Sequence, residues 1–191
     1  MRAPAEEPRG LVLKPDVITP DQETELGERF QTMRFDPIVI RGQAARRTAR
    51  HFGVGYDYQS REPGPAEPIP SWLGPAREAA AGLAGVEPEE LAEALINRYP
   101  PGAPIGWHRD APAFGIVVGI SLLAPARLRF QRGKREARRT WEVRLEPRSG
   151  YVLADEARRS WEHSIPATRE LRYSITFRTL NSPAGSRRLD S

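Results

Sequence analysis

The chain has 191 residues, of which 39% are hydrophobic and 28% charged, a composition typical of one globular domain. It contains no apolar run of about 18 residues and no apolar N-terminal segment, so the sequence predicts neither a membrane span nor a secretory signal. The absence of Cys excludes disulfides and zinc–thiolate sites, and leaves His, Asp and Glu as metal ligands. We therefore expect a cytoplasmic protein, monomeric by default, with one domain over residues 1–191.

The net charge is +4, and its distribution is more informative than its size. Two stretches concentrate basic residues: Arg46, Arg47 and Arg50 in the first, and Arg132, Lys134, Arg135, Arg138 and Arg139 in the second. Concentrated arginine can follow a phosphate backbone, so both stretches are candidates for nucleic-acid contact. The alternative is that each stretch forms a solvated loop.

In chain order, residues 1–9 are polar and Pro-rich and predict a loose tail, and residues 11–13 predict a short strand. Thr19, Pro20 and Gln22 form a capping-box pattern that predicts the start of a helix. Residues 35–40 predict a second strand.

Residues 46–58 interleave basic and aromatic residues, and Tyr56 and Tyr58 would share one face of a strand. Such a segment suits phosphate contact with base stacking, whereas the alternative is two tyrosines on the buried face of an edge strand. Four prolines predict a loop over residues 60–70. A helix over 75–84 and a helical turn over 87–92 follow.

From residue 94 onward the pattern is that of β-structure. We expect strands over residues 94–99, 115–122, 128–131, 141–145, 151–154, 161–165 and 173–180. Short strands separated by turn signals are typical of a sandwich or barrel. The predicted fold is α+β: a double-stranded β-helix, or jelly roll, with supporting helices packed on one sheet and its core over residues 94–180.

Three residues could form a metal site. His108 and Asp110 lie two apart and would point the same way on an extended segment, and His163 follows in a predicted strand. Two His and one carboxylate with open coordination positions is the ligand set of non-haem Fe(II) oxygenases.

The predicted last strand carries two arginines on one face. Arg172 and Arg178 alternate with apolar Ile175 and Phe177, and two inward guanidiniums would be costly without anionic partners. A dicarboxylate would supply those partners, since arginine binds carboxylates bidentately. The alternative is a strand whose arginine face is turned to solvent.

The sequence resembles the AlkB family of 2-oxoglutarate- and Fe(II)-dependent dioxygenases. The resemblance covers about residues 94–180 in order and spacing, and residues 46–58 more weakly resemble the family's nucleotide-recognition lid. The matching positions are Asn97-x-Tyr99, Gly102, Ile105, His108-Arg-Asp110, Gly119-Ile-Ser121-Leu122, Phe130, Ser149-Gly150, Ala157-Arg158, Trp161-x-His163 and Arg172-x-Ser-Ile-Thr-Phe-Arg178.

The resemblance implies that His108, Asp110 and His163 bind Fe(II), and that 2-oxoglutarate and O2 are co-substrates. The implied 2-oxoglutarate contacts are Arg172 and Tyr99 at the distal carboxylate, Arg178 and Asn97 at the carboxylate next to the keto group, and Ser174 nearby. The implied reaction is oxidative dealkylation of bases in DNA or RNA, releasing succinate, CO2 and an aldehyde. An N-terminal nucleotide-recognition lid would lie within residues 35–70.

The substrate contacts implied by the resemblance come from the lid and from around the metal motif. Tyr58 or Tyr56 would stack on a flipped base, and basic lid residues would contact phosphates. Arg109 would face away from the metal ligands and reach the substrate backbone. The full expected set is Tyr58, Tyr56, Arg47, Arg50, Arg109 and Trp161.

Two positions depart from the family pattern. Several demethylases of the family have an acidic residue shortly after the metal Asp, but here Asp110 is followed by Ala-Pro-Ala-Phe114. Ser174 stands where the family commonly has Asn. Two alternatives therefore stay open: the same oxygenase chemistry on a protein or small molecule, and a jelly-roll module that binds a small acid or a partner without catalysis.

Overall fold

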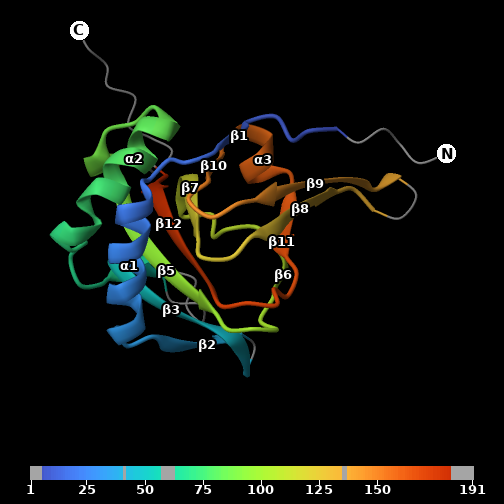
Figure 1. Cartoon of the computed structure of the whole chain (residues 1–191). Helices are drawn as coiled ribbons and strands as arrows, with labels where there is room; N and C mark the ends of the chain where they lie inside the picture. Colours follow the sequence, from blue (N-terminus) through green and yellow to red (C-terminus); the bar gives the residue numbers. More distant parts are fainter. Residues whose placement is uncertain (1–5, 41, 57–62, 135–136, 182–191) are drawn as a thin grey trace, which may run out of the picture.

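The computed structural model describes residues 6–40, 42–56, 63–134 and 137–181. In this part of the chain two antiparallel β-sheets face each other, and helices α1 and α2 cover the outer side of the larger sheet (Figure 1). This layered arrangement is the predicted jelly roll with supporting helices. No helix in the described ranges is both long and apolar enough to cross a membrane.

The larger sheet has eight strands, seven of them in the order β1-β10-β7-β12-β5-β3-β2, with β4 pairing to β3. Pro37 lies in β2, the edge strand, where a missing N–H does not interrupt the ladder. The strands are β1 (Leu11–Lys14), β2 (Asp36–Ile40), β3 (Gln43–Tyr56), β4 (Pro63–Pro65), β5 (Leu91–Tyr99), β7 (Phe114–Leu122), β10 (Gly150–Leu153) and β12 (Arg172–Leu180).

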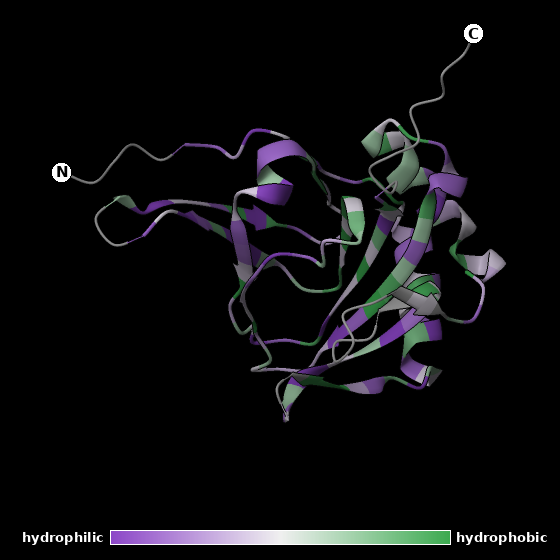
Figure 2. Ribbon diagram, turned by 180° about the vertical axis from the view of Figure 1, so that it is seen from behind, coloured by the Kyte–Doolittle hydropathy of each residue, from purple (hydrophilic) through white to green (hydrophobic). Residues whose placement is uncertain are grey.

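The smaller sheet has four strands in the order β6-β11-β8-β9. They are β6 (Ile105–His108), β8 (Ala126–Arg132), β9 (Arg139–Leu145) and β11 (Glu162–Ile165). Strands β8 and β9 form a hairpin that extends away from the body of the molecule (Figure 1). Hydrophilic residues are frequent along this hairpin (Figure 2).

Local sequence signals set the helix ends. Helix α1 (Pro20–Thr32) begins with the predicted capping box, in which Thr19 Oγ1 accepts from Gln22 N and Gln22 Oε1 accepts from Thr19 N. Helix α2 (Gly74–Ala84) ends at Gly85, which has φ of 68° and so favours glycine. The short helices are η1 (Ser71–Leu73), η2 (Pro88–Glu90) and α3 (Asp155–Arg159).

The two largest hydrophobic cores lie on the two sides of the larger sheet. One packs α1 and α2 against it and includes Phe30, Leu73 and Ile175. The other fills the space between the sheets and includes Phe130 and Trp161. Because side chains alternate along each strand, the larger sheet presents one apolar face to the helices, and its other face carries polar residues of β5 and β12 beside apolar side chains of the second core.

The structure differs from the sequence prediction in several places. Strand β4 lies in the segment expected to be a loop, and pairs with the end of β3. Strand β6 and helix α3 were not predicted as elements. The end of the expected loose tail is anchored, since Pro8 is buried and the Arg9 carbonyl accepts a hydrogen bond from Ala157 N.

Candidate metal centre and ligand-binding cavity

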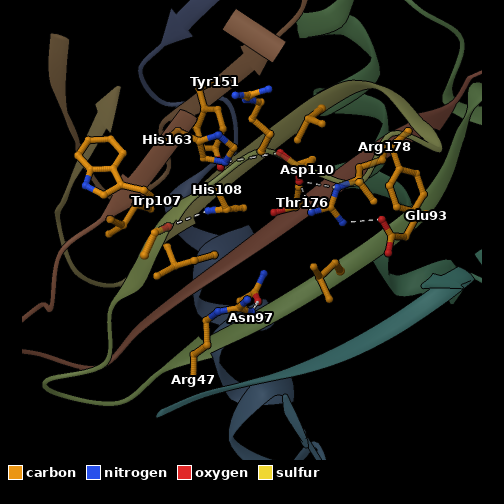
Figure 3. Close-up of a pocket in the computed structure, with 18 residues that line it drawn as sticks. Arg47, Glu93, Asn97, Trp107, His108, Asp110, Tyr151, His163, Thr176 and Arg178 are labelled. Atoms are coloured by element: carbon orange, nitrogen blue, oxygen red, sulfur yellow. Dashed lines mark hydrogen bonds and ion pairs between the residues drawn. The ribbon is translucent and has the colours of Figure 1, made fainter. Parts of the chain in front are cut away.

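The three predicted metal ligands meet between the two sheets. His108 ends β6, Asp110 follows two residues later, and His163 lies on β11 directly beside His108 in the strand register. The two imidazole rings have centroids 4.3 Å apart. One ligand atom from each of the three side chains lies within 4.8 Å of the others, so they could hold one metal ion (Figure 3).

The electrostatics of the three side chains suit metal binding at neutral pH. Burial lowers the pKa of His163 to about 3 and also lowers that of His108, so both rings are neutral and offer a lone pair. Burial alone would raise the pKa of Asp110, but the neighbouring charges together, that of Arg178 foremost, outweigh burial and hold that pKa well below its usual range. Asp110 is therefore an anion.

The hydrogen bonds of the three side chains also fit a bound metal ion. His108 Nδ1 lies 2.9 Å from the Gly106 carbonyl, which fixes the ring and leaves Nε2 for a ligand. Asp110 Oδ2 and His163 Nδ1 are buried and have no hydrogen-bond partner among the described residues. Buried polar atoms are rarely left unsatisfied, so a partner absent from the polypeptide is expected here. Two His and one carboxylate fit Fe(II) and leave coordination positions open.

A pair of arginines marks the two ends of the polar face of β12. Arg178 donates to Asp110 Oδ1 from Nε at 3.0 Å and from Nη2 at 2.6 Å. Its Nη1 donates to Glu93 Oε2 at 2.5 Å. The guanidinium of Arg178 therefore links the metal-ligand carboxylate to a second carboxylate (Figure 3).

Arg172, at the other end, is fully buried. Its Nε donates to Ser121 Oγ at 3.2 Å, and its guanidinium lies over the Tyr99 ring at 5.0 Å. Nη1 and Nη2 have no hydrogen-bond partner among the described residues. A buried cation with two unused donors is costly, and a carboxylate bound bidentately would satisfy it.

Strand register brings the predicted 2-oxoglutarate contacts together. On β12 and β5, Arg172 lies opposite Tyr99 and Ser174 lies opposite Asn97, both pairs on the face turned to the smaller sheet. Asn97 Oδ1 accepts a 2.8 Å hydrogen bond from Arg47 Nη1. All five predicted co-substrate residues, including Arg178, thus lie on one polar surface beside the metal ligands.

A cavity of about 510 Å³ opens beside this surface, a size typical of small-molecule sites. Its lining includes the three candidate metal ligands, Arg178 and Asn97. Arg109 also lines it, with a half-exposed side chain whose Nη2 lies 4.0 Å from Glu162 Oε1. The cavity therefore reaches solvent beside a cationic side chain.

Several predicted substrate contacts lie elsewhere. Trp161 is buried in the core between the sheets, so it cannot meet a substrate. Arg50 projects from the helix-covered face of β3, where it pairs with Asp36 and Glu67. Arg47 does line the cavity, but it is buried against Asn97 rather than free for a phosphate.

The side chains of the two predicted lid tyrosines fall outside the described part of the structure. Tyr58 lies outside the described residues. Tyr56 is the last residue of β3, and only its backbone belongs to the described part of the structure. The described part of residues 35–70 forms β2, β3 and β4 at the edge of the larger sheet.

Two titratable residues of the cavity lining were missed by sequence reasoning. Glu93 precedes the predicted strand, but it alternates with Asn97 and Tyr99, and this parity could have placed it on the same face. Tyr151 packs its ring over Gly119, where a Cβ would lie 2.2 Å from the ring. Burial raises the pKa of Tyr151 far above its usual range, so its hydroxyl is neutral. A glycine facing a strand tyrosine was the available signal.

A jelly roll with two His and one carboxylate beside a buried arginine defines the class of non-haem iron oxygenases that use a keto acid. Residues 13–178 match the 2OG-Fe(II) oxygenase superfamily, so the chain belongs to that family. It is an Fe(II)- and 2-oxoglutarate-dependent dioxygenase that is similar to AlkB, and its co-substrates are 2-oxoglutarate and O2.

Individual relatives agree with this membership. The alpha-ketoglutarate-dependent dioxygenase AlkB of Salmonella typhimurium is 34% identical over 148 residues, covering 69% of this chain and 65% of that protein. The "Alkylated DNA repair protein ALKBH8 homolog" of Arabidopsis thaliana is 26% identical over 187 residues, covering 82% of this chain and 51% of that protein. The solved structure of OsALKBH1 shares the fold, with a TM-score of 0.66 and 19% identity, covering 92% of this chain and 99% of that one.

Proposed function

We propose that this dioxygenase removes alkyl groups from nucleic-acid bases. The observation that carries the proposal is the polar surface of β12 and β5. This surface joins a His-Asp-His cluster at one end to a buried arginine at the other, which has no anionic partner among the residues that the structure describes. That arrangement supports an enzyme that oxidises a substrate at a metal while a dicarboxylate is held beside it.

In this proposal His108, Asp110 and His163 hold Fe(II). Arg172 and Tyr99 bind the distal carboxylate of 2-oxoglutarate, with Ser174 beside them. Arg178 and Asn97 serve the carboxylate next to the keto group. These assignments are supported by the shared face of the residues and by the two unused amino groups of Arg172.

When bound, iron and 2-oxoglutarate supply the oxidation of an alkyl carbon by O2, with succinate, CO2 and an aldehyde as products. The protein contributes orientation, charge and exclusion of water. Arg178 keeps Asp110 ionised, and burial keeps both imidazoles neutral, so all three ligands are ready to bind without losing a proton at pH 7. Arg172 is fully buried, so a carboxylate paired with it is shielded from competing water.

Two observations favour nucleic acid as the substrate: the distribution of basic charge and the name of a related protein. Residues 126–145, which span the protruding β8–β9 hairpin, include eight Lys or Arg and two Glu. Such a basic arm suits a phosphate backbone, and Arg109 adds a cation at the mouth of the cavity. A relative carries alkylated-DNA repair in its name. We also propose that residues 35–70 act as the substrate-recognition lid of a single domain.

The test is to incubate the Fe(II)-loaded enzyme with 2-oxoglutarate and a panel of oligonucleotides carrying N1-methyladenine, N3-methylcytosine or etheno bases, in DNA and in RNA. We expect mass loss from at least one modified base, with succinate and formaldehyde formed in equal amounts on a methylated base. Asp110→Ala serves as the inactive control.

Succinate formation that no oligonucleotide stimulates, with no mass change in any strand, would refute nucleic acid as the substrate class while leaving the oxygenase chemistry intact. The alternative is then a protein or small-molecule substrate. Replacing Arg109 and the hairpin's Arg132 and Arg139 with Gln separates the two, because only nucleic-acid activity depends on phosphate contacts.

A further inference from the structure

Glu93 is a fully buried carboxylate that the proposed chemistry does not use. It lies on β5 directly opposite Arg178 on β12, and Glu93 Oε2 accepts a 2.5 Å hydrogen bond from Arg178 Nη1. Its other oxygen, Oε1, lies 3.0 Å from Nδ1 of His51 on the neighbouring strand β3. A buried carboxylate is costly unless its oxygens have partners, and here both are engaged.

The guanidinium of Arg178 is thereby held on one side by Glu93. Its Nε and Nη2 both point at Asp110, at 3.0 and 2.6 Å from Oδ1. The group is planar and rigid, so fixing Nη1 also fixes the direction of the edge formed by Nε and Nη2. Figure 3 shows this edge turned to the metal ligands, with Glu93 behind it.

His51 supports the carboxylate from the far side. It donates to Glu93 when Nδ1 carries the proton, and a neighbouring carboxylate favours that tautomer. Three adjacent strands, β3, β5 and β12, thus contribute one residue each to a chain that runs from His51 through Glu93 to Arg178. Each link is a side-chain contact within hydrogen-bond distance.

We propose that Glu93, supported by His51, is a positioning residue that aims Arg178 at the metal centre and so sets the affinity for 2-oxoglutarate. This inference rests on the assignment of Arg178 to the carboxylate next to the keto group. Glu93 acts through Arg178 and does not touch the co-substrate. Arg178 without Glu93 keeps its charge but loses the contact that orients it.

A purely electrostatic role predicts the opposite result. Glu93 is an anion close to the place of a dianionic ligand, so removing its charge alone would strengthen 2-oxoglutarate binding. Positioning depends on the hydrogen bond instead. Gln keeps an acceptor for Arg178 and loses the charge, whereas Ala loses both, so the two substitutions separate the two roles.

The experiment measures the dissociation constant of 2-oxoglutarate by calorimetry on Mn(II)-loaded protein, without O2. We expect Glu93→Ala to weaken binding about tenfold, or ~1.4 kcal/mol, and Glu93→Gln to stay within about threefold of the unchanged protein. His51→Ala, which removes only the support, should weaken binding about threefold. Tighter binding by both Glu93 variants, or unchanged binding by His51→Ala, would overturn the proposal.

Two further variants make the result specific. Glu23→Ala also removes a carboxylate paired with an arginine, Arg148, but on helix α1, and should leave the dissociation constant unchanged. An equal loss in Glu23→Ala would overturn the proposal. Arg178→Ala tests the underlying assignment: normal binding there would refute the role of Arg178 itself. Weak binding by Arg178→Ala with normal binding by Glu93→Ala would refute positioning alone.

Discussion

The two ends of strand β12 hold arginines in opposite surroundings. Arg178 contacts two carboxylates, Asp110 and Glu93, and is part of the protein's own network of charges. Arg172 is more deeply buried, yet its two terminal amino groups have no partner in the described part of the chain. The contrast separates two roles. Arg178 orders the metal ligands, whereas Arg172 gains hydrogen-bond partners for its terminal amino groups only when a ligand binds.

The largest expected effect is a loss of folding stability when Arg178 is replaced. Arg178→Met leaves the carboxylate of Glu93 buried without its cation, so we expect the free energy of unfolding to fall by about 3–5 kcal/mol. Urea denaturation of the metal-free protein at pH 7 measures this. Adding Glu93→Gln to the same variant should recover part of the loss. A loss below about 1 kcal/mol would mean that Glu93 does not depend on Arg178.

Replacing Arg172 should weaken ligand binding rather than destabilise the folded protein. Arg172→Met removes the proposed bidentate partner of the distal carboxylate, so we expect 2-oxoglutarate to bind about 100-fold more weakly, or ~2.7 kcal/mol. The metal-free protein should be equally or more stable, because a buried charge that has no anionic partner in the described part of the chain has been replaced by an apolar side chain. Calorimetry and urea denaturation test the two halves. Lower stability would contradict the contrast between the two arginines.

Lowering the pH should reduce the stability of the folded protein first through His163, one of the three candidate metal ligands. Burial holds the pKa of His163 at about 3 in the folded protein, against about 6.5 when unfolded, so the unfolded state binds the proton more readily between these values. Stability is therefore intact above pH 6.5 and falls as the pH drops below it. We expect a loss of about 2 kcal/mol from pH 7 to pH 5 through His163.

His108, whose pKa is also lowered, adds a loss in the same direction. The lowered pKa of Asp110 contributes only at more acidic pH, as the pH falls through and below the usual carboxyl range. Denaturation of metal-free protein at several pH values, with His163→Gln as control, separates these contributions. An equal pH dependence in His163→Gln would show that another group is responsible.

The sequence predicted the parts of this site that depend on spacing within one segment. His108 and Asp110 follow from their separation, and Arg172 and Arg178 share a face because strand side chains alternate. The same parity, applied to residues 47 and 50, would have shown that Arg47 and Arg50 face opposite ways on β3. Helix α1 was predictable because its capping box is local.

The remaining features depend on register between distant segments. Glu93 meets Arg178 across 85 positions, and only the pairing of β5 with β12 brings them together. Trp161 is buried because the facing sheet covers it, which nothing in its own segment indicates. Long-range packing of this kind overrides local pattern, so the site's charge network was not available from the sequence.

The smallest predicted effect on 2-oxoglutarate binding concerns Tyr99, whose ring contacts Arg172. The Tyr99 ring lies under the Arg172 guanidinium at 5.0 Å, and Tyr99→Phe keeps this contact while removing the hydroxyl. If the hydroxyl helps to bind the distal carboxylate, 2-oxoglutarate should bind about threefold more weakly. Tyr99→Leu, which also removes the ring, should weaken it further. In an Arg172→Met background the effect of Tyr99→Phe should disappear, because the carboxylate is then no longer held there. A threefold effect that persists in that background would mean that Tyr99 acts independently of Arg172, and the two residues would not form one carboxylate site.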